Sequence, residues 1–130
     1  MKELNKFSIK TRIRSFSFAF NGLKDLIKTE HNARIHLAAM IIVIVFGILF
    51  KIDITEWISL TIVVGLVILS ELFNTSIEKL SDIVDPERNI KIGQIKDYAA
   101  AAVLISAIIS IIVGGLVFIP KIIELIKNFY

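Results

Sequence analysis

Apolar residues gather in three long stretches of the chain, at residues 33–50, 57–77 and 98–120. The third stretch contains no charged residue, and the second contains one, Glu71. A helix of roughly 20 mostly apolar residues is long enough to cross the hydrocarbon core of a bilayer. Three such stretches in a soluble fold would leave no polar face to cover them. The pattern therefore predicts an all-α integral membrane protein with three transmembrane helices.

A different pattern precedes the first stretch. In residues 8–29, apolar side chains recur at helical spacing and basic side chains lie off that stripe. A basic, aromatic helix of this kind binds in the plane of a membrane surface that carries anionic lipids. We therefore expect an amphipathic surface helix on the inner leaflet. Its apolar stripe consists of Ile9, Ile13, Phe16, Phe20, Leu23 and Ile27.

Composition supports a single membrane domain over residues 1–130. Hydrophobic residues make up 55% of the chain and charged residues only 21%, which is more apolar than a typical soluble domain. The absence of cysteine excludes disulfides and cysteine-ligated metal sites. The chain contains neither a Walker-type GxxxxGK[ST] motif nor a GxGxxG motif, and we predict no nucleic-acid partner.

The basic residues predict the orientation of the chain. Twelve of the 15 Lys and Arg residues lie before the first stretch, at its start (Arg34) or in the segment 78–97. Because cytoplasmic loops of membrane proteins carry an excess of Lys and Arg, the N-terminus and a 78–97 loop are predicted to be cytoplasmic. The 51–56 connection then faces outward, where Asp53 and Glu56 match a capping box that opens the second span.

Glu71 is the outlier within the apolar stretches, since a charge inside a membrane is costly and is usually functional. On a helix, Asn74 and Glu78 share its face, with Glu78 about 10 Å further along the axis. Three further polar residues, Glu30, Lys96 and Asp97, are expected near the same inner interface. Carboxylates with a lysine and an amide suit Mg²⁺ and a phosphorylated ligand.

These residues resemble the motifs of the prokaryotic diacylglycerol kinase family, which includes bacterial undecaprenol kinases. The matching elements are Glu71-Leu-Phe-Asn74-Thr-Ser-Ile-Glu78, the Lys96-Asp97 pair, and upstream Glu30 and Arg34-Ile-His36. The resemblance implies an ATP- and Mg²⁺-dependent lipid kinase in the bacterial cell membrane. It also implies a homotrimer whose active sites are shared between neighbouring subunits at the cytoplasmic interface.

The resemblance further implies a role for each matching residue. Glu71 would be the base that takes a proton from the lipid hydroxyl, and Asn74 would orient the reacting groups. Phe18 stands where some family members have tyrosine, and the segment Glu87-Arg88-Asn89 matches the family poorly. The implied Mg²⁺ ligands are Glu30 and Glu78. The implied ATP contacts are Phe18, Glu30, Glu78, Glu87, Arg88, Asn89, Lys96 and Asp97. The implied lipid contacts are Glu71, Ala100 and Arg34.

Two other function classes stay open on the residues alone. A carboxylate in a transmembrane helix also marks proton or cation carriers, and a small structural subunit would need no reactive Glu71. The lipid substrate is open as well, since diacylglycerol and undecaprenol both present a primary hydroxyl. Arg34-Ile-His36 is more similar to the undecaprenol kinase branch.

Overall fold

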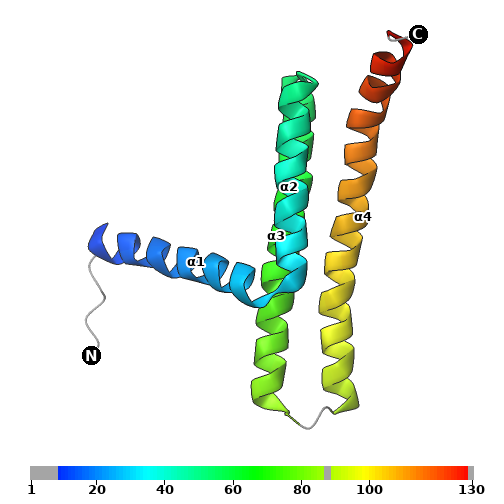
Figure 1. The fold of residues 1–130 in the computed structure, drawn as a ribbon. Coiled ribbons are helices and arrows are strands. Elements are labelled where there is room, and N and C mark those ends of the chain that lie inside the picture. The colour runs from blue at the N-terminus through cyan, green and yellow to red at the C-terminus, as the bar shows by residue number, and fades with distance from the viewer. Residues whose placement is uncertain (1–8, 87–88, 129–130) are drawn as a thin grey trace.

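The computed structural model describes residues 9–86 and 89–128, and this part of the chain forms four α-helices. Figure 1 shows three of them running lengthwise together, while the N-terminal helix extends crosswise from the start of the second. The predicted all-α architecture is therefore confirmed. The helices are α1 (Ile9–Thr29), α2 (His31–Leu49), α3 (Ile54–Val84) and α4 (Ile90–Lys127).

The helices α2, α3 and α4 are each long and apolar enough to cross a membrane. They are 19, 31 and 38 residues long, so α3 and α4 continue well beyond the predicted spans 57–77 and 98–120. The segment 78–97 is consequently helical for most of its length, and only residues 85–89 connect α3 to α4. Apolar composition marks the part of a helix that suits hydrocarbon, whereas backbone hydrogen bonding continues into polar sequence.

Two prolines illustrate how context decides where a helix ends. Pro86 follows Asp85, whose extended backbone (φ −147°, ψ 93°) closes α3, because proline disfavours the helical conformation of the preceding residue. Pro120 instead lies inside α4, which continues to Lys127. Neighbouring helices and local adjustments make proline tolerable inside membrane helices.

The connection between α2 and α3 contains the predicted capping box. The Asp53 carboxylate accepts hydrogen bonds from the backbone N–H groups of Thr55 (2.8 Å) and Glu56 (2.9 Å), and the Glu56 carboxylate accepts from the Asp53 N–H at 2.9 Å. These bonds satisfy N–H groups that the helix itself leaves free. The hydrogen bond from the Glu56 N–H is the main reason that the pKa of Asp53 lies below its ordinary value.

The most tightly packed apolar region lies beside this connection. Ile52, Leu60 and Val117 are buried there, and Trp57 packs against them. Gly47 is required at this point because a Cβ atom on it would lie 2.5 Å from the Trp57 ring. The close approach of α2 to α3 therefore depends on a residue without a side chain.

Elsewhere the three long helices expose large apolar side chains. Ile48 of α2, Ile62 of α3 and Leu116 of α4 are each more than 60% exposed. Such faces are stable in hydrocarbon, which needs no polar surface, but would be unfavourable in water. Polar side chains also join the helices: a hydrogen bond of 2.7 Å connects the Ser70 and Ser106 hydroxyls across α3 and α4, and ion pairs connect Lys79 to Asp25 and Lys121 to Glu56.

Candidate active site

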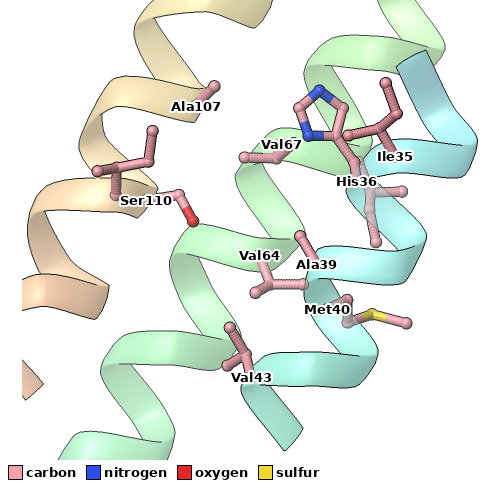
Figure 2. Close-up of a pocket in the computed structure, with 11 residues that line it drawn as sticks. Ile35, His36, Ala39, Met40, Val43, Val64, Val67, Ala107 and Ser110 are labelled. Atoms are coloured by element: carbon pink, nitrogen blue, oxygen red, sulfur yellow. The ribbon is translucent and has the colours of Figure 1, made fainter. Parts of the chain in front are cut away.

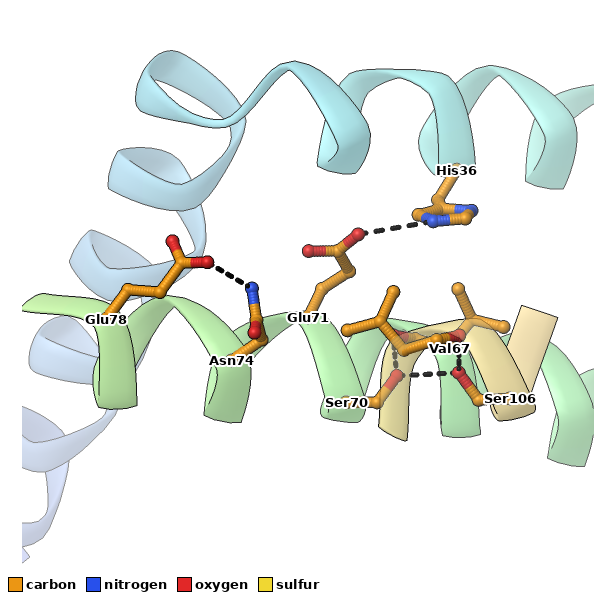
Figure 3. Close-up of polar contacts among 8 residues, drawn as sticks. His36, Val67, Ser70, Glu71, Asn74, Glu78 and Ser106 are labelled. Atoms are coloured by element: carbon orange, nitrogen blue, oxygen red, sulfur yellow. Dashed lines mark hydrogen bonds and ion pairs between the residues drawn. The ribbon is translucent and has the colours of Figure 1, made fainter. Parts of the chain in front are cut away.

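The polar residues of α3 form a short row on one side of the helix. Glu71 is only 3% exposed despite its carboxylate. Further along, the Asn74 side chain donates to the Glu78 carboxylate, with Nδ2 and Oε1 3.1 Å apart. Figure 3 shows the three side chains following one another on α3. Their common face agrees with the helical spacing from which it was predicted.

A histidine of α2 completes this row. His36 Nε2 lies 3.2 Å from Glu71 Oε1, and the His36 side chain is 25% exposed. Figure 3 shows the imidazole facing the carboxylate from the opposite helix. The sequence placed His36 in a family motif but assigned it no role. The feature of the sequence that could have indicated His36 is its polar side chain within the apolar stretch 33–50, near the same predicted inner interface as Glu71.

Glu30 lies at the junction of α1 and α2, where its backbone caps α2 without a capping bond from its side chain. Thr29 Oγ1 donates to its Oε1 at 3.1 Å. Glu30 and Glu78 both lie close enough to Glu71 for their charges to interact with its charge. The structure therefore brings Glu30, Glu71, Asn74 and Glu78, four of the six residues of the expected group, into one region.

Three oxygen atoms in this row are buried without a hydrogen bond from the described residues: Glu71 Oε1, Asn74 Oδ1 and Thr75 Oγ1. Glu71 Oε1 is among them because its 3.2 Å contact with His36 is an ion-pair distance without hydrogen-bond geometry. Buried polar atoms in proteins nearly always find a partner, so a group of unpartnered ones calls for an explanation such as water, an ion or a ligand. Residues 71–75 are thus able to accept hydrogen bonds or coordinate a cation from outside the chain.

Among the predicted nucleotide contacts, Glu30 and Glu78 lie near Glu71, whereas Lys96, Asn89 and Phe18 have other partners within one chain. The Lys96 ammonium forms an ion pair with Asp82, and the neighbouring Asp97 is exposed. Asn89 caps α4 by accepting from the Lys91 N–H at 2.9 Å. Phe18 is exposed on α1, and the Arg14 guanidinium carbon lies over its ring, 5.7 Å from the ring centre. Glu87 and Arg88 lie outside the described residues.

The predicted lipid contacts Arg34 and Ala100 are exposed, on α2 and α4 respectively. Two cavities adjoin Glu71 and its histidine partner. A cavity of about 160 Å³ lies among α1, α2 and α3, and both Glu71 and His36 line it. A second, of about 270 Å³, lies among α2, α3 and α4, with Met40 and Val64 in its apolar lining (Figure 2). His36 lines both cavities.

The oxygen donors of this region suit a magnesium ion shared with a substrate. Among residues 9–86 and 89–128, no three His, Cys, Asp or Glu side chains approach closely enough to form a metal centre from protein ligands alone. Mg²⁺ usually binds one or two carboxylates together with phosphates and water. Glu30, Glu78 and the unpartnered Asn74 Oδ1 provide donors of that kind.

Comparison with known proteins gives consistent results. The sequence pattern of the prokaryotic diacylglycerol kinase family matches residues 17–118. The chain is 36% identical over 119 residues to the undecaprenol kinase of Bacillus subtilis, covering 92% of this chain and 93% of that protein. It is 33% identical over 112 residues to the diacylglycerol kinase of Synechocystis sp., covering 85% of this chain and 64% of that protein.

These matches confirm the resemblance that the motifs of α3 and the Lys96-Asp97 pair predict. They also decide between the function classes left open by the residues, because a carrier and a structural subunit are not phosphotransferases. The three apolar helices and the matches together identify a membrane protein. With a family pattern over most of its length and two related kinases, the chain belongs to the prokaryotic diacylglycerol kinase family of lipid kinases.

Proposed function

We propose that this lipid kinase transfers the γ-phosphate of ATP to the primary hydroxyl of a membrane lipid, undecaprenol or diacylglycerol, with Mg²⁺ as its cofactor. The observation that carries the proposal is the buried Glu71 carboxylate, which lies next to Asn74 and Glu78 where α3 meets the α1–α2 junction. A carboxylate with this burial is placed to act on a lipid hydroxyl rather than on water.

In this reaction Glu71 accepts the proton of the lipid hydroxyl. The hydroxyl oxygen forms a bond to the γ-phosphorus as the bond to the bridging oxygen breaks, and ADP leaves. Phosphoryl transfer depends mainly on positioning and on charge stabilisation. Bound Mg²⁺, held by Glu30 and Glu78, would supply most of that charge stabilisation. Asn74 would orient the reacting groups, and Lys96 would bind phosphate oxygens after exchanging its ion pair with Asp82.

We assign the nucleotide to the connection between α3 and α4 and to the exposed side of α1. The residues proposed to contact it are Phe18, Glu30, Glu78, Glu87, Arg88, Asn89, Lys96 and Asp97. Within one chain Lys96 pairs with Asp82 instead of with Glu71 or Glu78, which supports a homotrimer with sites shared between subunits. The exposed apolar faces of α2–α4 offer surfaces for such an assembly.

The lipid would approach Glu71 from the bilayer, with Arg34 and Ala100 beside its head group. We favour undecaprenol, because the relative that this chain covers almost completely is an undecaprenol kinase. The exposed apolar side chains of α1, including Phe16 and Phe20, support a helix lying on the anionic inner leaflet of the bacterial cell membrane. In this orientation the N-terminus and the proposed site face the cytoplasm.

A direct assay tests the proposal. Purified protein in detergent receives ATP, Mg²⁺ and either undecaprenol or diacylglycerol, and the phosphorylated lipid is measured. We expect product with at least one lipid and faster turnover with undecaprenol. Absence of product with both lipids would contradict the function, and faster turnover with diacylglycerol would contradict the preference.

The same assay tests the role of Glu71. Glu71→Gln keeps the shape of the side chain but cannot accept the proton, so we expect turnover to fall by about 10²–10⁴-fold. Nucleotide binding, measured by fluorescence of a bound ATP analogue, should stay unchanged. Turnover close to that of the parent protein would remove Glu71 from the mechanism.

A further inference from the structure

A general base must hold its reacting oxygen in a defined place. Carboxylates and other reacting groups work well only when neighbouring contacts fix their geometry closely. The Glu71 side chain has several rotatable bonds, so burial alone does not define where its two oxygens lie. A second polar group is needed to set the direction of the carboxylate.

The neighbouring amide on the same helix does not provide that contact. The Asn74 Nδ2 group donates to Glu78, one turn further along α3. Among the described residues, the polar side chain within hydrogen-bond distance of the Glu71 carboxylate is His36, whose Nε2 lies 3.2 Å from Oε1. Glu71 Oε1 is buried from solvent, so water does not compete freely for it.

His36 has mainly apolar surroundings apart from Glu71. The residue lines two cavities whose walls are mainly apolar. Figure 3 shows that the other Glu71 oxygen points away from the imidazole, toward the Asn74–Glu78 end of α3. The imidazole therefore lies beside one carboxylate oxygen, and the other oxygen faces the proposed phosphate site.

We propose that His36 is a positioning residue for Glu71: during the reaction its Nε2–H donates to the neighbouring Oε1, so that the second oxygen faces the lipid hydroxyl. The neutral tautomer with a proton on Nε2 and the imidazolium both carry the required donor. This inference rests on the proposed function, because it assigns His36 a role in the reaction that Glu71 performs. The contact also joins α2 to α3, so the placement of the base depends on how these helices pack.

The test compares two substitutions that differ in one property. His36→Gln keeps an N–H donor at about the reach of Nε2, whereas His36→Met has a similar length and no donor. We expect His36→Met to lower kcat by about 10²-fold with an unchanged KM for ATP, and His36→Gln to restore most of that loss. Equal kcat values for the Met and Gln variants would overturn the proposal.

A double-mutant cycle separates positioning from general damage. In a Glu71→Gln background the carboxylate is gone, so His36→Met should cause no further loss of kcat. The same fractional loss in both backgrounds would show that His36 acts independently of Glu71 and would overturn the proposal. Val63→Ala, which removes buried methyl groups about two turns away on α3, is the control for altered packing. It should lower the melting temperature and keep kcat.

Two further results keep the outcomes distinct. If His36→Met does not fold, His36→Asn replaces it, because its amide is too short to reach Oε1 and should lose kcat in the same way. If the parent protein phosphorylates no lipid, the proposed function fails. If Glu71→Gln keeps full turnover, Glu71 is not the base, and the positioning role of His36 fails with it. If Glu71→Gln is inactive while the folded His36→Met or His36→Asn variant has parental kcat, the function stands and the positioning role fails.

Discussion

Glu71 and Glu78 belong to the same helix but have different surroundings. Glu71 is buried and faces a histidine of another helix, whereas Glu78 is partly exposed and accepts a hydrogen bond from Asn74. A partly exposed carboxylate keeps its charge readily and can share a cation with phosphates and water. These differences favour Glu71 as the base and Glu78 as a Mg²⁺ ligand.

The proposed metal role of Glu78 gives a specific expectation. Glu78→Gln keeps an oxygen that can accept from Asn74 but removes the negative charge that attracts Mg²⁺. The Mg²⁺ concentration for half-maximal activity and the KM for ATP should both rise, and kcat should fall. A Mg²⁺ titration of lipid phosphorylation at fixed ATP measures this. The control is Glu124→Gln, which changes an exposed carboxylate near the C-terminal end of α4. Unchanged Mg²⁺ dependence in Glu78→Gln would show that Glu78 is only a helix-end charge.

At the residue scale, the sequence could predict which side chains share one face of a helix. The common face of Glu71, Asn74 and Glu78 follows from the 3.6-residue period alone. The contact between His36 and Glu71 could not be predicted in this way, because it depends on how α2 is placed against α3. The ion pair of Lys96 with Asp82 has the same origin, since it crosses from α4 to α3.

At the scale of helices and connections, apolar runs predicted where the spans lie but not how far the helices extend. Hydropathy falls where α3 passes Ile77, yet its backbone remains helical to Val84 because no residue breaks the hydrogen-bond ladder before Asp85-Pro86. The capping box at Asp53 and Glu56 was predictable because it is local and its residue types are distinctive. The sequence therefore located the start of α3 more sharply than its end.

The close contact of Gly47 with Trp57 predicts a packing effect. In Gly47→Ala the new methyl group would lie 2.5 Å from the Trp57 ring, so α2 and α3 must move apart. Overpacking of this kind costs about 1–3 kcal/mol, and thermal unfolding in detergent should show a lower melting temperature. Gly114→Ala is the matched control, because a Cβ there meets no atom within 4 Å. An equal melting temperature for Gly47→Ala and the parent would contradict this packing.

The capping box also predicts a dependence on pH. The N–H of Glu56 lowers the pKa of Asp53 in the folded chain, so the ionised cap stabilises α3 above the ordinary Asp pKa of about 3.9. This stabilisation is lost as the pH falls through the lower folded value. Asp53→Asn keeps an oxygen acceptor that does not titrate. The melting temperature of the parent should therefore fall more steeply below about pH 4 than that of Asp53→Asn, and parallel curves would exclude the effect.

At the scale of the whole molecule, the carboxylates of the candidate site and the packed apolar cluster lie at different places along the helices. Glu30, Glu71 and Glu78 gather where α1 joins the lengthwise helices, while the buried apolar cluster around Leu60 lies toward the α2–α3 connection (Figure 1). Such a molecule groups its buried and partly buried carboxylates near the α1–α2 junction and presents long apolar sides elsewhere. This arrangement suits an enzyme that receives its lipid from the bilayer and its phosphate donor from water.

The proposed mechanism requires one orientation of this molecule. ATP is cytoplasmic, so Glu78, Lys96 and the α3–α4 connection must face the cytoplasm. The distribution of Lys and Arg independently predicts the same orientation, since twelve of the 15 lie before the first predicted span, at its start or in the segment 78–97. The connection between α2 and α3 must then lie on the outer side.

Cysteine labelling in intact cells tests this orientation, because the chain contains no cysteine of its own. Asn89 and Ile54 are exposed at opposite ends of the lengthwise helices, so each receives a single cysteine in a separate variant. A membrane-impermeant thiol reagent is applied to cells stripped of their outer layers. Ile54→Cys should react at once, whereas Asn89→Cys should react only after lysis. The reverse pattern would place the carboxylates of α3 away from ATP and would contradict the proposed kinase mechanism.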